Sequence, residues 1–171
     1  MTMLKTQRLA CGASLLALAL IGLSAASAKA DDAIERGRYL ATIMDCGGCH
    51  TPGALAGQPD MAHALGGSEI GFEIPGLGVF YPPNLTPDNE TGLGNWSEAE
   101  IIAAIRTGLR PDGRELAPIM AWRSYGALTD ADAHALALYL KSLPAFSHQA
   151  PAMAGSGAQA THPYMTPVIP Q

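Results

Sequence analysis

Apolar and small residues recur every three to four positions between residues 33 and 45, with charged residues between them. This spacing places them on one face of a helix, as expected for a helix that packs on a core. Asp31 or Asp32 stands where an N-cap is needed and would start this helix. The face predicted to be buried consists of Ala33, Gly37, Leu40 and Met44.

Two further segments show helical spacing and have clear boundaries. Ser97, followed three residues later by Glu100, forms a capping box, and the apolar residues behind it end near Gly108. The last predicted helix begins at Thr129, has acidic residues in its first turn, and ends before Pro144. No segment shows convincing strand alternation, so we expect an all-α domain with three main helices and long loops.

Two regions lack a helical period. The connection formed by residues 51–95 is rich in Gly and Pro and is longer than the loops of ordinary compact domains. Residues 146–171 form a tail rich in Pro, Ala and Gly that is predicted to be disordered or extended over the surface. The long connection therefore needs a partner on which its apolar residues can pack, chiefly Pro75, Leu77, Val79, Phe80 and Leu85.

Directly before this connection stands the most specific motif of the chain, Cys46-Gly47-Gly48-Cys49-His50. A C-x-x-C-H run is the attachment signature of a c-type haem. The two thiols add to the vinyl groups of the porphyrin, and the imidazole becomes the proximal ligand of the iron. The motif occurs once, which predicts one covalent haem c, and the haem would give the long connection its packing surface.

Three other interpretations of the motif are less favoured. A structural zinc site needs a second pair of Cys or His ligands at similar spacing, and none follows Cys49. A thioredoxin-like pair would start a helix after a strand, whereas this pair ends a helical run. A disulfide between Cys46 and Cys49 would leave His50 unexplained.

The N-terminus has the pattern of a secretory signal peptide, residues 1–30. Lys5 and Arg8 precede the apolar residues 9–23, and small residues follow, with cleavage favoured after Ala30. Cys11 would leave with the signal. An uncleaved membrane anchor is the alternative, but the apolar run is short for a span. Because c-type haem is attached outside the cytoplasm, the sequence predicts a bacterial periplasmic protein with no stable membrane span after cleavage.

Charge and length narrow the possible partners. The 171 residues carry 10 basic and 15 acidic side chains, a net charge of −5, and cleavage after residue 30 would leave 7 and 15, a net charge of −8. An acidic surface of this kind is not expected to bind nucleic acid or anionic lipid. About 141 residues would remain, enough for one domain, which we place at residues 31–145.

The order of helix, CGGCH motif, long loop, helix, methionine loop and final helix resembles a class I monohaem cytochrome c over residues 31–145. Residues 84–144 are similar to the haem domains in cytochrome subunits of periplasmic dehydrogenases, such as the alcohol and gluconate dehydrogenases. Those subunits typically carry three such domains, whereas this chain has one motif. It also has Ala121 and Trp122 where those domains usually place Pro after the methionine.

The resemblance implies that Met120 is the distal axial ligand. The sequence favours the same residue, because Met120 lies seventy residues beyond His50 in a Pro-flanked loop and can reach the opposite face of the haem. Met44 is too close to the motif, Met61 follows His50 closely, and Met153 and Met165 lie in the tail. His63 is the alternative ligand that we would test, since His is also a common axial ligand.

Polar and aromatic groups are needed to receive the haem propionates or to pack on the ring edge. Trp122, two residues beyond Met120, is the favoured cofactor-binding residue among them. Packing in the core is an equal alternative for Trp96 and Tyr125. The full set of candidates is Tyr81, Trp96, Arg106, Trp122 and Tyr125.

These expectations favour one-electron transfer over catalysis. With His50 and Met120 on the iron, no site is open to a substrate, and the partners would be a periplasmic dehydrogenase together with a terminal oxidase or another cytochrome. One alternative is an electron-accepting subunit of a dehydrogenase complex. The other, a peroxidase or haem sensor, would need an open distal site and has no distal His or Arg motif to support it.

Overall fold

The computed structural model describes residues 29–168 and 170, so almost all of the predicted signal peptide lies outside the described residues. The first helical stretch covers residues 29–43 and already includes Asp31 and Asp32. The prediction that one of these residues caps the helix is therefore wrong, because the helical hydrogen bonding already includes both residues. Within residues 29–168 and 170, no helix combines the length and apolarity that a membrane span requires.

The two other main helices are confirmed with their predicted ends. Helix α3 (Glu98–Thr107) starts at Ser97, whose side chain accepts a hydrogen bond from the Glu100 amide, while the Glu100 carboxylate accepts one from the Ser97 amide. Gly108 ends α3 with a φ of 77°, the left-handed conformation that glycine adopts without strain. Helix α5 (Asp130–Ser142) follows Thr129, whose side chain accepts a hydrogen bond from the Asp132 amide.

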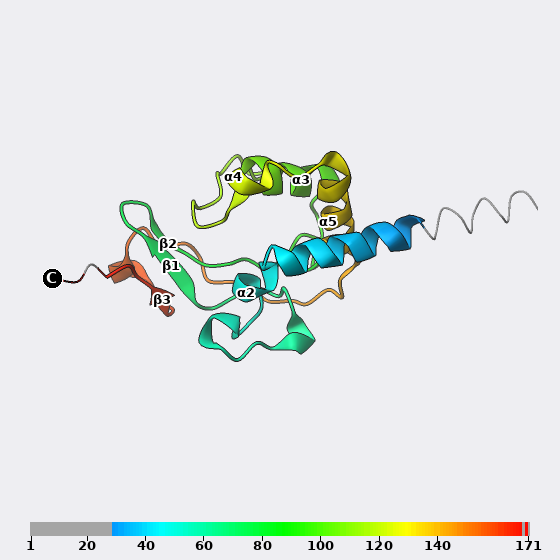
Figure 1. Cartoon of the computed structure of the whole chain (residues 1–171). Helices are drawn as coiled ribbons and strands as arrows, with labels where there is room; N and C mark the ends of the chain where they lie inside the picture. Colours follow the sequence, from blue (N-terminus) through cyan, green and yellow to red (C-terminus); the bar gives the residue numbers. More distant parts are fainter. Residues whose placement is uncertain (1–28, 169, 171) are drawn as a thin grey trace, which may run out of the picture.

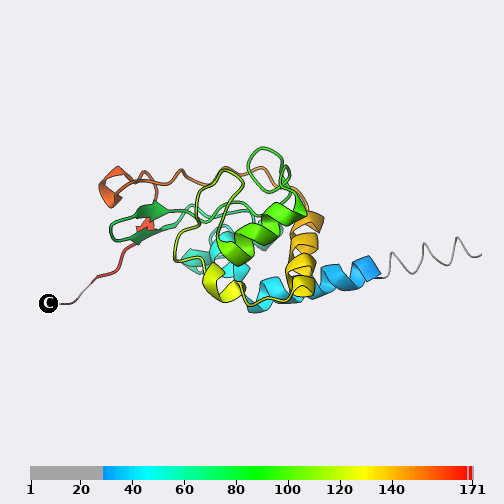
Figure 2. The same ribbon diagram turned by 90° about the horizontal axis from the view of Figure 1, so that it is seen from above.

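The N-terminal helix, α3 and α5 pack around one hydrophobic core. Figure 2 shows α5 crossing the N-terminal helix, and α3 lies in contact with α5. Lys141 of α5 fixes the loop before α3, because its ammonium group donates hydrogen bonds to three backbone carbonyls of that loop, those of Leu93, Gly94 and Trp96. The buried residues of this core are Leu40, Ala41, Leu65, Leu93, Ile101, Ile105, Leu136, Ala137 and Leu140.

A small sheet departs from the all-α prediction, although the domain is mostly helical. Strand β1 (Gly71–Ile74) pairs antiparallel with β2 (Gly78–Phe80), with Phe72 opposite Phe80. Strand β3 (Tyr164–Met165) adds to the other edge of β1 in parallel, in the order β2-β1-β3. Strands of two to four residues are too short to show alternation in a sequence, which explains why they were missed.

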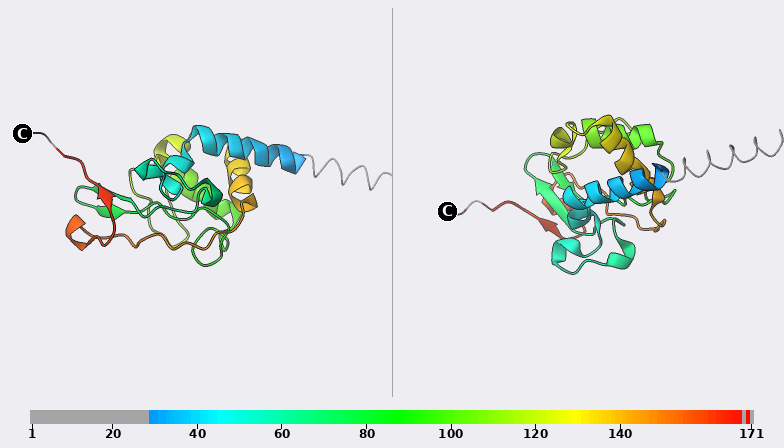
Figure 3. Two further views of the ribbon diagram at one scale, coloured as in Figure 1. Left: turned by 90° about the horizontal axis from the view of Figure 1, so that it is seen from below. Right: turned by 45° about the vertical axis from the view of Figure 1, so that its right-hand side comes forward.

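The C-terminal tail follows an extended course along the molecule (Figure 3). The amide and carbonyl groups of Ala154 both bond to Val79 of β2, and a short 3₁₀ helix, η3 (Gly157–Gln159), then turns the chain back toward β3. Tyr81 donates its hydroxyl to the carbonyl of His162, and the Gly71 amide donates to the carbonyl of Pro163. The tail thus contacts the β1-β2 hairpin at both of its edges.

Short elements complete the frame around the motif. Helix α2 (Cys46–His50) contains the motif itself and is followed by the 3₁₀ helices η1 (Ala54–Ala56) and η2 (Met61–His63). Helix α4 (Trp122–Tyr125) lies between α3 and α5 in the chain. In Figure 1, α3 and α4 lie on one side of the molecule, and α2 and the hairpin lie across from them.

Candidate haem-binding cleft

A sharp turn delivers the chain from the N-terminal helix to the motif. Asp45 has a left-handed backbone conformation with a φ of 54°, which Asp tolerates better than most residues, and α2 begins directly after it. The Asp45 carboxylate folds over Gly48, where a β-carbon would lie only 2.6 Å from Oδ1. A side chain at position 48 would therefore require the Asp45 carboxylate to move away.

Cys46 and Cys49 are free thiols one helical turn apart on α2. Burial raises the pKa of Cys46 to about 11, and burial together with the Asp45 carboxylate raises the pKa of Cys49. Both side chains are therefore neutral thiols at neutral pH, which makes them poor nucleophiles and argues against a redox-active pair.

His50 is held by a backbone carbonyl from the long connection. Its Nδ1 lies 2.8 Å from the carbonyl oxygen of Pro83, and because a carbonyl only accepts, Nδ1 carries the proton. This leaves Nε2 as the unprotonated nitrogen. Burial lowers the pKa of His50, which keeps the imidazole neutral, the form in which it binds a metal.

Cys46, Cys49 and His50 line one wall of a cleft that encloses about 1160 Å³, part of it open to solvent. The other walls come from the β1-β2 hairpin and the segment after it, from α3 and α5, and from the loop that carries Met120, called the methionine loop. Arg110 and Arg114 are the only lining residues with a permanent charge in the described part of the chain. The apolar lining includes Phe72, Phe80, Pro82, Pro83, Leu85, Leu93, Ile101, Ile105, Leu116, Leu136 and Leu140.

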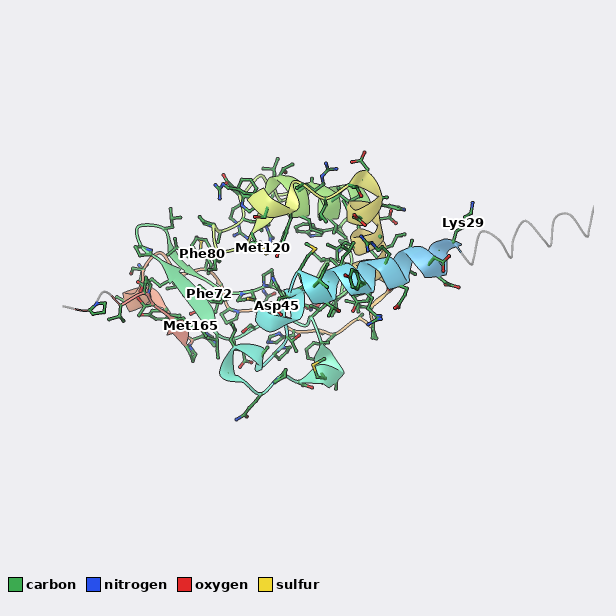
Figure 4. The ribbon with its side chains drawn as sticks, viewed as in Figure 1. Lys29, Asp45, Phe72, Phe80, Met120 and Met165 are labelled. Carbon is green, nitrogen blue, oxygen red and sulfur yellow. The ribbon has the colours of Figure 1, made fainter. Side chains whose placement is uncertain are left out.

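Met120 lies on the opposite side of this cleft from α2. A turn closed by a hydrogen bond from the Met120 amide to the Ala117 carbonyl, 2.9 Å long and with Pro118 as its second residue, presents the methionine. Figure 4 shows Met120 on the side of α3 and α4, with Asp45 at the start of α2 across from it, and Phe72 and Phe80 beside both.

Two alternative ligands considered in the sequence analysis, Met61 and His63, lie outside the cleft. Met61 is 70% exposed, and the His63 ring stacks on Phe146 while its Nδ1 lies 2.6 Å from an Asp60 carboxylate oxygen. Neither side chain lines the cleft. Met44 does line it, but it belongs to the same side as Cys46, two residues further along the chain.

The structure brings together only some of the polar and aromatic candidates. Tyr81, Trp96 and Tyr125 line the cleft, and the Tyr125 hydroxyl donates to the carbonyl of Met44. Arg106 pairs with Asp130 on the surface and does not line it.

Trp122 is also absent from the cleft lining. Its ring packs against Gly108, and the Arg123 guanidinium lies 4.1 Å from the ring centroid. Its Nε1 is buried and has no hydrogen-bond partner among the residues that the structure describes. The structure thus places Trp122 against Gly108 at the end of α3 rather than in the cleft where we expected it.

Sequence reasoning missed Phe72, Arg110 and Arg114 as lining residues. Phe72 lies in a strand that was not predicted. The two arginines flank Pro111-Asp112-Gly113, a turn sequence that could have placed their side chains next to each other.

Two neutral thiols and a neutral imidazole on one wall of an apolar cleft are the groups that covalent attachment of a haem requires. The mainly apolar lining with a few convergent polar groups is typical of sites that bind a large organic cofactor. Fold and site together define a c-type haem protein of mainly helical structure.

Comparison with known proteins places the chain more narrowly. It belongs to the cytochrome c family, whose model matches residues 34–144. Membership of this family implies a covalently bound haem c and a role in electron transfer. The matched region begins within the N-terminal helix and ends directly after α5, so the tail lies beyond it.

Several curated relatives are cytochrome subunits of dehydrogenases. The chain is 40% identical over 124 residues to the cytochrome c subunit of alcohol dehydrogenase (quinone) from Gluconobacter oxydans (strain 621H). This alignment covers 70% of this chain and 24% of the relative. It is 38% identical over 130 residues to the gluconate 2-dehydrogenase cytochrome c subunit from Pantoea cypripedii, covering 74% and 27%. The corresponding subunit of fructose dehydrogenase from Gluconobacter japonicus is 37% identical over 107 residues, covering 63% and 20%. The chain spans about a quarter of the length of these relatives.

Proposed function

We propose that the protein is a one-electron carrier with a single c-type haem in this cleft, ligated by His50 and Met120. In this proposal it works in the periplasm, where it passes electrons between a dehydrogenase and the respiratory chain. The observation that carries the proposal is the orientation of His50, whose Nδ1 is engaged by Pro83 and whose Nε2 is left unprotonated in a cleft shared with two thiols.

Each residue has a separate task in this proposal. Cys46 and Cys49 hold the cofactor covalently, and the Pro83 carbonyl fixes the tautomer of His50. Met120 would supply a second ligand from the opposite side of the cleft, and the apolar lining would keep water away. When bound, the haem supplies a centre that accepts and releases one electron. With His50 and Met120 both serving as ligands, the iron would have no position open for a substrate.

Optical spectra of the purified protein in its oxidised and reduced forms test this proposal. We expect haem that stays with the chain after denaturation and extraction, one haem per chain, and the weak band of a methionine sulfur on ferric iron. Haem that is removed by extraction would contradict covalent attachment. A spectrum of five-coordinate iron would instead favour the peroxidase or sensor alternative.

A second candidate function is that of an electron-accepting subunit in a dehydrogenase complex. The similarity to cytochrome subunits of alcohol, gluconate and fructose dehydrogenases favours it. Affinity purification of the native protein from its own cells distinguishes the two functions, because a subunit retains a dehydrogenase at fixed stoichiometry and a free carrier does not. N-terminal sequencing of the same material is expected to begin at Asp31 if the signal peptide is removed after Ala30.

A further inference from the structure

Two arginines are brought side by side by one tight turn at the edge of the cleft. The Leu116 amide donates to the carbonyl of Gly108, and the Arg110 amide donates to the carbonyl of Arg114 at 3.0 Å. Gly113 adopts a φ of 79° and completes the turn. Arg110 and Arg114 therefore stand opposite each other as the first and last residues of the turn.

Both arginines line the cleft and contact neighbouring side chains. Arg110 lies 5.1 Å from the ring centroid of Trp96, which itself lines the cleft. The Asp112 carboxylate lies between the two arginines, 3.2 Å from Nε of Arg110 and 4.0 Å from Nε of Arg114. In the described part of the chain, the contacts of Asp112 with both arginines use Nε, so their terminal Nη groups can face another acceptor.

The charge of this edge is opposite to the charge of the molecule. The chain has a net charge of −5, yet among the residues that the structure describes Arg110 and Arg114 line the cleft and no Asp or Glu does. The single carboxylate of Asp112 lies near both guanidinium groups, so the turn carries two positive charges against one negative charge. A guanidinium group next to an apolar cleft is suited to bind a carboxylate in a bidentate manner.

We infer that Arg110 and Arg114 bind the two propionate groups of the haem. This inference rests on the proposed binding of haem in the cleft. A haem carries two carboxylates that must leave water when the ring enters an apolar cleft, and ionised groups in such a place require cationic partners. Arg106 and Arg123 do not serve this purpose, because they pair with Asp130 and Glu115 and do not line the cleft.

The test uses the haem-loaded protein and the substitutions Arg110→Gln and Arg114→Gln, with Arg123→Gln as the matched control. Arg123 lies in the same part of the chain and loses the same charge, but it is outside the cleft. We expect the propionate bending bands in resonance Raman spectra to shift in the first two variants only. At a fixed applied potential, their ratio of ferrous to ferric protein should fall by roughly tenfold, the effect of losing one charge about 10 Å away at a dielectric constant near 20.

Lysine variants distinguish the effect of hydrogen bonding from the effect of charge. They also provide the test if a glutamine variant does not fold. Arg110→Lys and Arg114→Lys keep the charge and lose the planar fork, so the bands should shift while the ratio changes less. Raman bands and ratios equal to those of Arg123→Gln in all four variants would overturn the inference. Wild-type protein without covalent haem would instead contradict the proposed function, and the two failures are therefore distinguishable.

Discussion

Gly37 of the N-terminal helix lies directly against Tyr139 of α5, so that a β-carbon at Gly37 would lie 2.6 Å from the Tyr139 β-carbon. It would also collide with the backbone carbonyl of Ala135. The two helices can cross this closely only because position 37 has no side chain. This contact agrees with the sequence analysis, which placed Gly37 on the buried face of the first helix.

Replacing Gly37 by Ala tests the crossing. The added methyl group meets backbone atoms that cannot rotate away, so the free energy of unfolding should fall by about 1–3 kcal/mol. Denaturant titration of the haem-loaded protein measures the change. Thr42→Ala, on the exposed side of the same helix, is the control and should change it by less than roughly 0.5 kcal/mol. Equal effects of both substitutions would mean that the helices separate easily at this point.

The second prediction concerns attachment. The double variant Cys46→Ala and Cys49→Ala should retain no haem after denaturation, because no thiol remains on α2. The long connection would then lose its packing partner, and far-ultraviolet circular dichroism should show a less folded chain. The measurement is haem staining of the denatured protein after electrophoresis. Covalent haem in the double variant would refute the assignment of the motif.

The third prediction separates the candidate methionine ligands. Met120→Ala should abolish the methionine band of the ferric protein, lower the potential, and allow carbon monoxide to bind to the ferrous form. Met61→Ala is the matched control, because Met61 is exposed and does not line the cleft. If Met61→Ala loses the band and Met120→Ala keeps it, the assignment is wrong.

Lys141 gives a fourth prediction. Lys141→Met keeps the length of the side chain but removes the donor of three hydrogen bonds to the loop before α3. We expect the free energy of unfolding to fall by about 2 kcal/mol, since hydrogen bonds to charged groups are the stronger ones. Arg38→Met, which breaks an exposed ion pair with Glu35, should leave it almost unchanged. A comparable effect of both substitutions in thermal unfolding would show that the three bonds contribute little.

The fifth prediction tests the contacts of the tail with the hairpin. Removal of residues 152–171 deletes Ala154 and β3, so the amides of Val79 and Gly71 lose their acceptors. Hydrogen exchange of the haem-loaded protein should show faster exchange at these two amides. The amides of Gly67 and Leu85 are internal controls, since their acceptors His50 and Leu65 remain. Unchanged protection at Val79 and Gly71 would mean that the hairpin holds its shape without the tail.

The sequence predicted most reliably the features that depend on neighbouring residues. Ser97 and Glu100 form a capping box within one turn, so three residues of spacing were enough to place the start of α3. The beginning of α5 at Thr129 was readable for the same reason. The motif on α2 is likewise local, and its cysteines and histidine lie together in the cleft.

Features that depend on distant residues could not be predicted in this way. Strand β1 takes a hydrogen-bond partner from Pro163, more than ninety residues along the chain, and no local pattern signals such a contact. Trp122 shows the opposite error, because closeness in sequence to Met120 was taken as closeness in direction. Helix α4 begins at Trp122, and side chains two positions apart at a helix start point to different sides.

The contacts between the hairpin and the tail also bear on the order in which the molecule assembles. Gly71 with Pro163 and Val79 with Ala154 join residues that are far apart in the chain, and contacts of this kind require large loops to close. The helical contacts around α3 are local by comparison, and local contacts form faster. We therefore expect the part of the cleft lined by Phe72 and Phe80 to form late in folding, after α2 has formed with its two thiols. The haem could then enter the cleft from the side of the hairpin before that side closes.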